Sequence, residues 1–341
     1  MKNKLLSKSN IVIYLLIAAF IVGAFASKYF LGLENLKLIM FSCCVYGVIA
    51  IGQSLVMITK EIDLSVGAMI AFLPTLAVQT INRISQLTGN GKIIVGGNYI
   101  MTNWIFIVIL TLVFGALVGL VNGLITVKLK VPSLIVTLGM MTALGGLVYV
   151  LSGGYDLYMT NMEGVKWIGT FAVGGVVPVN FIIFIAIGTV MVILMRYTKF
   201  GMRIYSTGGR ERAARLSGIN TDKWKTIAFM LSGLFTGVAA LIYCSRMETI
   251  GASQGSGYEM TAIAICVVGG VTLEGGKGTI LGSMLSAILI TVVLNIQQLL
   301  GLVSWYQNLT VGIIVVFAAL LHNYRGSEKK KTVRARAATA E

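Results

Sequence analysis

The sequence has very little charge. Only 11% of its 341 residues are Asp, Glu, Lys or Arg, while 57% are hydrophobic and the mean hydropathy is +0.89. A soluble domain of average composition carries roughly 25% charged residues. The polar side chains are too few to cover a water-soluble globule, so a soluble domain is excluded and a polytopic membrane protein is indicated.

Histidine is almost absent, and cysteine forms no motif. The single histidine, His322, ends the last apolar run. One histidine cannot supply a metal site of the usual kind, and at the end of a span it leaves no Ser-His-acid set to build. The four cysteines lie inside apolar runs without CxxC or metal-ligand spacing, and we expect them to be small buried residues. They are Cys43, Cys44, Cys244 and Cys266. The sequence therefore predicts neither an enzyme nor a bound cofactor or metal.

A nucleotide-binding loop and paired carboxylates within spans are also missing. The nearest string to such a loop, 275–279, lacks the upstream glycine and has Gly278 where Ser or Thr should follow the lysine. Glu61 and Asp63 fall at a turn, and Glu259 falls at the end of a span. Because ionisable groups inside a bilayer mark proton and ion relays, this pattern disfavours a proton-coupled pump.

What the sequence has in abundance is apolar runs. We predict an all-α, polytopic transmembrane bundle of about ten spans, with both termini in the cytoplasm. The predicted spans are 11–27, 38–59, 64–81, 104–127, 134–151, 179–195, 226–245, 259–273, 279–299 and 305–321. Residues 1–323 would form one transmembrane domain, and 324–341 a basic, disordered cytoplasmic tail. A cleaved signal peptide ending near 24–26 is an alternative for the first run.

Basic residues indicate the orientation. Of the 27 Lys and Arg, 21 fall in segments that this topology places inside: 3 in the N-terminal tail, 1 at Lys60, 2 in 128–130, 8 in 196–225, 1 at Lys277 and 6 in the C-terminal tail. Short basic loops resist translocation, which predicts a bacterial cytoplasmic (inner) membrane protein of this orientation. The net charge of +15 is explained by these loops and by anionic lipid, so no nucleic-acid partner is expected.

Several spans carry small residues four positions apart. Gly115, Gly119 and Gly123 share one face of a span, and Gly233 and Gly237 share a face of another. Such faces let helix backbones approach closely, so we interpret them as packing surfaces of a compact bundle.

The segment 196–225 is the longest strongly polar stretch between apolar runs, with eight basic residues against Glu211 and Asp222. Within it, 210–219 (RERAARLSGI) predicts a short helix, since Ala, Arg and Leu favour helix and Gly218 can end it. A short helix outside the bilayer is either a solvated connector or a docking element for a soluble partner.

The spans contain neutral polar side chains in place of charged ones. The candidate pathway residues are Gln53, Asn122, Thr137 and Asn295. Such groups can hydrogen-bond a hydroxylated solute without burying a charge, but each can equally bond a neighbouring helix. As a set they suit an uncharged polar cargo.

The chain resembles a known family in five blocks over nearly its whole length. The blocks are 52–67 (GQSLVMITKEIDLSVG), 118–123 (VGLVNG), 129–140 (LKVPSLIVTLGM), 200–219 with its strong AARLSGI ending, and 257–259 with 269–279 (GGVTLEGGKGT). These blocks resemble the permease subunits of ribose-type importers of the ATP-binding-cassette (ABC) superfamily, which serve monosaccharides and autoinducer-2.

The resemblance implies partners and a mechanism. Two permease chains, identical or different, would form the pathway, two cytoplasmic ABC ATPase subunits would drive it, and an extracytoplasmic sugar-binding protein would deliver the solute. A short cytoplasmic helix of such permeases sits in a groove on the ATPase. Here that helix would comprise Glu211, Arg212, Ala213, Ala214, Arg215, Leu216, Ser217, Gly218 and Ile219.

One departure and several alternatives remain open. Lys60 and Glu61 stand where the family often has two glycines, which makes the turn stiffer and more charged. This variant and the Trp305–Tyr306 pair leave rhamnose or autoinducer-2 open as cargo besides ribose-like sugars. A nucleoside or an amino acid is less favoured. Two other classes of protein compete: a self-sufficient secondary transporter, which would work without an ATPase, and a membrane-embedded enzyme, for which the sequence offers little.

Overall fold

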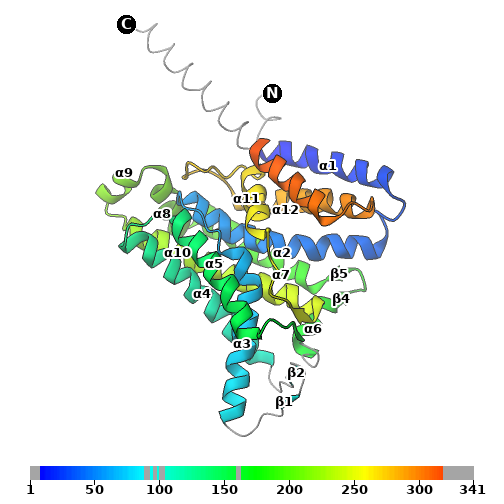
Figure 1. Ribbon diagram of the computed structural model, residues 1–341. Coiled ribbons are helices and arrows are strands. Elements are labelled where there is room, and N and C mark those ends of the chain that lie inside the picture. Colours follow the sequence, from blue (N-terminus) through cyan, green and yellow to red (C-terminus); the bar gives the residue numbers. More distant parts are fainter. Residues whose placement is uncertain (1–7, 88–92, 95–97, 100–103, 159–162, 318–341) are drawn as a thin grey trace.

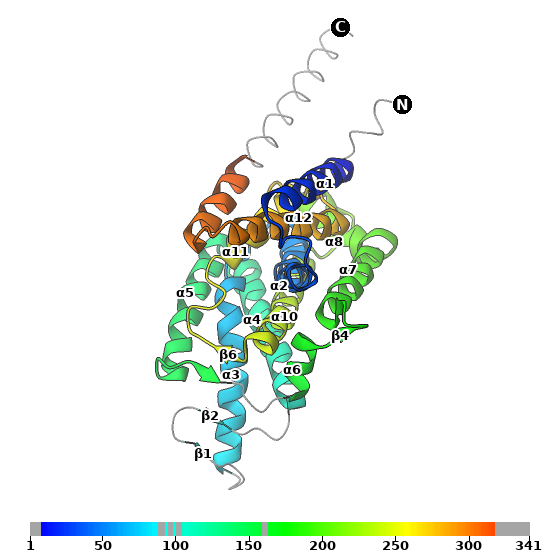
Figure 2. The same ribbon diagram turned by 90° about the vertical axis from the view of Figure 1, so that its right-hand side faces the viewer.

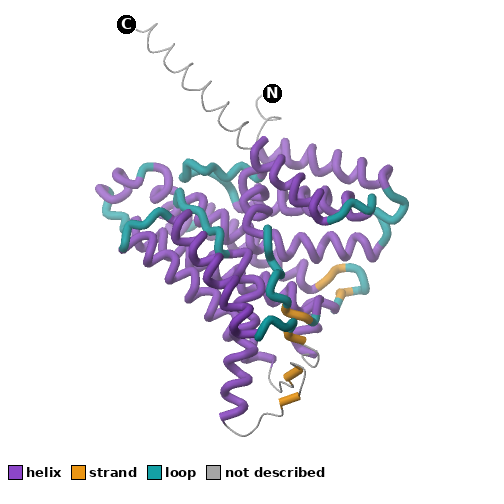
Figure 3. Tube along the Cα trace, in the orientation of Figure 1, coloured by secondary structure: helices purple, strands orange, loops and turns teal. Residues whose placement is uncertain are grey.

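The chain folds into a bundle of helices with a few very short strands (Figure 1). The computed structural model describes residues 8–87, 93–94, 98–99, 104–158 and 163–317. The predicted basic tail 324–341 and His322 lie outside the described residues. Figure 3 shows that the strands form small pairs at the edge of an otherwise helical molecule.

The helices follow the apolar runs closely. Their bounds are α1 (Lys8–Ala26), α2 (Leu33–Ile58), α3 (Val66–Leu87), α4 (Trp104–Lys128), α5 (Ser133–Ser152), α6 (Glu163–Thr170), α7 (Val179–Tyr197), α8 (Lys199–Gly209), α9 (Glu211–Leu216), α10 (Thr221–Met247), α11 (Tyr258–Val268) and α12 (Ile280–Leu299), followed by an apolar helix at Ser304–Phe317. Each of the ten predicted spans overlaps one of these helices. Among the described residues, six helices are long and apolar enough to cross a membrane: α2, α4, α5, α7, α10 and α12. The count of ten spans stays a prediction.

The strands pair in antiparallel twos. β1 (Ile93–Ile94) pairs with β2 (Asn98–Tyr99), β3 (Leu157–Tyr158) with β6 (Thr249–Ile250), and β4 (Ala172–Val173) with β5 (Val177–Pro178). All six strands among the described residues lie between the predicted spans.

Two local predictions differ from the structure. The span predicted at 259–273 is the 11-residue helix α11, which ends at Val268 because Gly269 and Gly270 turn the chain, Gly270 with φ of +90°. At 1.5 Å per residue α11 extends only about 16 Å, half of a hydrocarbon core. The second difference is α8, a helix that was not predicted because the segment 196–225 is strongly polar. Its buried residues recur at helical spacing: Gly201, Ile204, Thr207 and Gly208.

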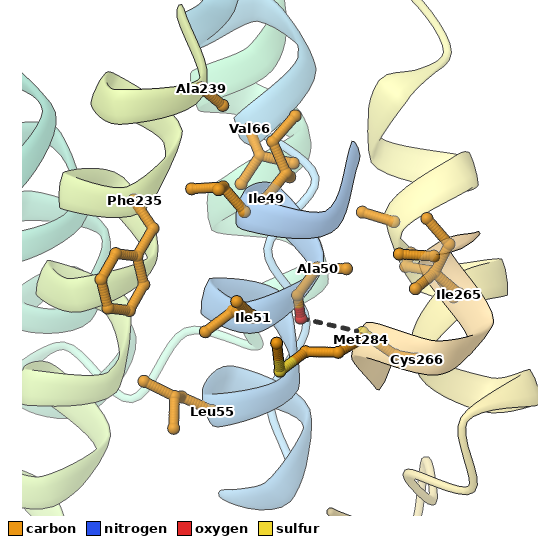
Figure 4. Packing of buried hydrophobic residues seen from close by; sticks show 14 of the residues in the cluster. Ile49, Ala50, Ile51, Leu55, Val66, Phe235, Ala239, Ile265, Cys266 and Met284 are labelled. Carbon is orange, nitrogen blue, oxygen red and sulfur yellow. Dashed lines mark hydrogen bonds between the residues drawn. The ribbon is translucent and has the colours of Figure 1, made fainter. Parts of the chain in front are cut away.

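Helix α2 occupies the centre of the bundle. Figure 2, which looks nearly along α2, shows α7, α10, α11 and α12 arranged around it, and each of them packs against it. From Cys43 to Ile58 almost every side chain is buried. Figure 4 shows Ile49, Ala50 and Leu55 among residues of the neighbouring helices, with the Ala50 carbonyl accepting a hydrogen bond from Cys266 Sγ of α11 at 3.3 Å.

The predicted small-residue faces form a very close helix contact. A Cβ atom built on Gly233 of α10 would lie 2.0 Å from the carbonyl oxygen of Gly115 on α4, and one on Gly119 would lie 2.1 Å from the Phe229 oxygen. These distances leave no room for a side chain, so the two backbones touch directly. The interpretation of these glycines as a packing surface is confirmed.

The loops gather at two ends of the bundle. At one end, the Gly276 amide donates to the Ile58 carbonyl at 2.8 Å, which joins the loop 269–279 to the end of α2, and Gly208 of α8 lies against the same carbonyl. Helix α10 runs from this end, beside α9, to β6 at the other end. Three segments predicted to be cytoplasmic, namely the turn after α2, the segment 196–225 and the loop 269–279, therefore lie together, while the side of the membrane that they face stays a prediction from charge.

We expect Gly233→Ala to destabilise the protein, because the new methyl group would force α4 and α10 apart. Overpacking of this kind costs about 1–3 kcal/mol. Gly139→Ala in α5 is the matched control, since no neighbouring atom lies within 4 Å of its built Cβ. Thermal unfolding in detergent should show a lower midpoint for Gly233→Ala alone. Equal midpoints for both variants would contradict the close contact.

Candidate functional site

A polar turn between α2 and α3, residues 59–65, is folded into the interior except at Lys60, which is exposed, and at Glu61 and Ile62, which are half-buried. The Asp63 side chain is completely buried and accepts hydrogen bonds from the Ser65 amide at 3.0 Å and the Ser65 hydroxyl at 2.6 Å. Its other carboxylate oxygen accepts from the Ser232 hydroxyl of α10 at 3.2 Å. Asp63 lies in a turn, as predicted, but the turn is within the bundle, so Asp63 fixes the start of α3 to α10.

Two of the four candidate pathway residues converge on this turn. The Asn122 side chain of α4 donates from Nδ2 to the Ser65 hydroxyl at 2.9 Å. The Thr137 hydroxyl of α5 donates to the Ser133 carbonyl at 2.8 Å and contacts the Ile62 carbonyl at 3.3 Å. Both side chains are fully buried, and the Asn122 Oδ1 atom has no hydrogen-bond partner among the described residues. Four elements, α3, α4, α5 and α10, thus meet at one polar turn.

The other two candidates lie elsewhere and differ from each other. Asn295 of α12 and Asn35 of α2 exchange two amide hydrogen bonds, at 2.8 and 3.0 Å. Asn35 is near the start of α2, whereas the polar turn follows its end, so Asn295 is not part of that site. Gln53 is fully buried on α2, and neither its Oε1 nor its Nε2 atom has a hydrogen-bond partner in the described part of the chain. An unpaired buried amide is costly and calls for an explanation, such as a solute or water.

The predicted short helix exists as α9 (Glu211–Leu216). The Ile219 amide donates to the Ala214 carbonyl and the Gly218 amide to the Arg215 carbonyl, both at 3.0 Å, with Gly218 at φ of +79°. This pattern is a Schellman motif, which needs a left-handed residue, so the predicted stop at Gly218 is confirmed. Of the six helical residues only Ala214 is buried, while the Leu216 side chain is 84% exposed.

Ion pairs attach α9 to the rest of the protein. Arg215 pairs with Glu211 at 2.9 Å and also with Asp222. Lys225 of α10 pairs with Glu211 at 3.0 Å and with Glu61 of the polar turn at 2.9 Å. These charged side chains line a hollow of about 360 Å³ at the ends of α4 and α9. The cluster makes a continuous charged connection from α9 to the turn that carries Asp63.

The ion pairs of Glu211 favour its charged form. Partial burial raises the pKa of Glu211, but hydrogen bonds from Arg215 and Lys225 outweigh it and the pKa is lowered overall. The same contacts raise the pKa of Arg215, chiefly through its hydrogen bond to Glu211. A carboxylate with a lowered pKa contributes stability that is present above its ordinary pKa and is lost only as pH falls through the lowered value. The attachment of α9 is therefore complete at neutral pH.

Sequence reasoning missed the residues that join these features. Packing of α10 on the turn brings Ser232 together with Asp63 and Ser65, which lie far from it in the sequence. In the sequence, Lys225 is simply one of the eight basic residues of 196–225. The Lys60–Glu61 departure was the one available signal for Glu61. Within the described part of the chain, no three His, Cys, Asp or Glu side chains come together as a metal site.

A bundle with six helices long and apolar enough to cross a membrane, and with polar groups turned inward, has the architecture of a multi-pass membrane protein. The chain belongs to the family described as branched-chain amino acid transport system / permease component, which matches residues 35–319. With its six apolar helices, this membership supports the predicted localisation in the bacterial cytoplasmic membrane.

Relatives are similar over almost the full length. The chain is 34% identical to the ribose import permease protein RbsC of Escherichia coli over 319 residues, 93% of each chain. It is 33% identical to RbsC of Haemophilus influenzae over 94% of each chain. It is 31% identical to the autoinducer 2 import system permease protein LsrC of Yersinia enterocolitica, over 87% of this chain and 77% of that protein. No solved structure matches the chain significantly.

We expect Asp63→Leu to destabilise the bundle, because it leaves the Ser65 and Ser232 donors without their acceptor. Each unpaired buried group costs about 1–3 kcal/mol. Glu274→Leu serves as the control, since Glu274 is an exposed carboxylate in another turn at the same end. The check is thermal unfolding of both variants in detergent, and an unchanged midpoint for Asp63→Leu would refute the structural role.

Proposed function

We propose that this chain is the membrane-spanning permease subunit of an ABC importer. It forms the pathway for a monosaccharide that an extracytoplasmic binding protein delivers, and ATP hydrolysis is carried out by a separate cytoplasmic subunit. The observation that carries this proposal is the similarity to ribose import permeases over 93% of the chain. In this reading the chain transports and does not catalyse, and two permease chains, identical or different, share the pathway.

The polar groups of the interior fit an uncharged, hydroxylated solute. Gln53 offers an amide that lacks a partner among the described residues, and Asn122 offers an unpaired carbonyl oxygen. An amide can both donate to and accept from sugar hydroxyls. The family description mentions branched-chain amino acids, but the relatives named for a solute carry ribose or autoinducer 2. The alternative cargoes are autoinducer-2 and rhamnose.

Helix α9 is the proposed docking element for the ATPase. It projects from the bundle in Figure 1, and Leu216 gives it an exposed apolar side chain. Helix α9 is connected to α7 through α8. On its other side, four residues connect α9 to α10. Movement of α9 by the ATPase would therefore pass to two long helices, and alternating access follows if these rock as rigid bodies.

A secondary transporter remains the competing function, because it would use a carboxylate inside the bundle and Asp63 is one. Asp63 is held by three donors from Ser65 and Ser232, which suits a structural anchor better than a group that exchanges protons. Uptake by the purified chain alone in liposomes, driven by a proton gradient without an ATPase, would favour this alternative.

We expect Leu216→Asp to weaken the attachment of the ATPase, because it replaces the exposed apolar side chain of the proposed docking helix with a charge. Replacing an apolar anchor of this kind costs about 2 kcal/mol or more, a loss of roughly 30-fold in affinity. The control is Leu31→Asp, whose side chain is 61% exposed in the turn before α2, predicted to be external. Native mass spectrometry of the mildly solubilised complex reads the result. Retention of two ATPase subunits by Leu216→Asp would count against docking through α9.

A comparison of two variants, Gln53→Leu and Asn295→Leu, distinguishes a residue of the transport pathway from a residue that serves helix packing. Gln53→Leu removes an unpaired amide, so we expect unchanged or higher thermal stability with uptake reduced at least about 10-fold. Asn295→Leu removes both amide hydrogen bonds between Asn295 and Asn35, so we expect lower stability, by about 1–3 kcal/mol. The measurements are thermal unfolding and binding-protein-dependent sugar uptake in proteoliposomes. Normal uptake by Gln53→Leu would remove it from the pathway.

A further inference from the structure

Lys225 bridges two parts of the protein. Its Nζ atom lies 2.9 Å from Glu61 and 3.0 Å from Glu211. The side chains of Lys225 and Glu61 are each 14% exposed, whereas those of Glu211, Arg215 and Asp222 are 39–51% exposed. Exposed ion pairs are screened by water and salt and contribute little, while a sheltered pair is screened much less. Lys225–Glu61 is therefore the most protected link of the cluster.

The two carboxylates that Lys225 joins belong to segments that are held to the bundle to different degrees. Glu211 opens α9, whose packing is against α8 and α10 with only Ala214 buried. Glu61 lies in the polar turn, which is fixed on several sides. The Ile62 amide donates to the Ser133 hydroxyl of α5 at 3.2 Å, and Asp63 is bonded to α10. The Lys225 side chain thus contacts a lightly held helix and a firmly held turn at the same time.

The backbone of the turn is also constrained. Lys60 has φ of +70°, a left-handed conformation that non-glycine residues adopt at a cost. The Glu61 amide donates to the Val56 carbonyl at 3.1 Å, which continues the last turn of α2 into this segment. A pull on Glu61 consequently acts on α2 and α3 together, and Asn122 and Thr137 contact the same turn.

We propose that Lys225, through Glu61, is a positioning residue that transmits movement of α9 to the polar turn and so links ATP hydrolysis to opening of the pathway. This proposal rests on the proposed function as an importer permease. Glu61 stands where the resembling family often has glycine, so the link belongs to this chain's own version of the turn and not to the family pattern in general.

A double-mutant cycle with neutral replacements tests the relay. The protein is reconstituted with its ATPase and binding protein, and the solute imported per ATP hydrolysed is measured for Lys225→Met, Glu61→Gln and the double variant. Each single change should lower this ratio about 5-fold or more, the low end of ordinary coupling between sites. The double variant should be no worse than either single change, because all three remove the same link.

The matched control is Lys223→Met, two residues away on α10. Lys223 is exposed and forms no ion pair with the described residues, so its ratio should equal that of the unmodified protein. A normal ratio for Lys225→Met, or losses that multiply in the double variant, would overturn the relay. Loss of the ATPase from Lys225→Met would also overturn it, by showing a docking role. Failure of the unmodified protein to bind an ATPase would instead reject the importer function itself.

Discussion

The structure depends on the burial of α2 on every side. Helix α2 is apolar on most sides, and α7, α10, α11 and α12 cover it where other apolar helices of the chain remain largely uncovered by protein. Polar groups on such a helix then need internal partners: the Ser54 hydroxyl bonds to Ser283 at 2.8 Å and to its own helix. Gln53, one residue away, has none among the described residues. Because Gln53 is buried in this helix, its amide needs a hydrogen-bond partner from outside the chain, such as a solute or water.

Much of the fold follows from the sequence because apolar runs in a membrane protein have few alternatives to helix. The glycine faces also predicted where backbones touch, although not that Gly115 would meet Gly233. The exceptions have local causes. Helix α11 stops early because Gly269 and Gly270 turn the chain inside an apolar run. Helix α8 was not predicted because its exposed face is basic and only a few of its residues are buried.

The site was less accessible to sequence reasoning. Helix α9 could be predicted, since residue propensity and Gly218 act locally. The polar groups could not be sorted, because their roles depend on partners far away in the chain. Asn295 is paired with Asn35, 260 positions distant, and Asn122 with Ser65, 57 positions distant. Both asparagines lie in apolar helices, and only the packing shows that one belongs to the polar turn and the other to a helix contact.

Helix α10 combines several of these features on one rigid rod. Its 27 residues extend about 40 Å at 1.5 Å per residue, with Lys225 near one end and β6 just beyond the other. Gly233 keeps it in direct backbone contact with α4 near its middle. A rod of about 40 Å that tilts by about 5° around its middle moves its two ends by about 1.7 Å in opposite directions. With Gly233 near its middle as a pivot, α10 would act as a lever, in which a small displacement beside α9 becomes an opposite displacement on the far side of the bundle.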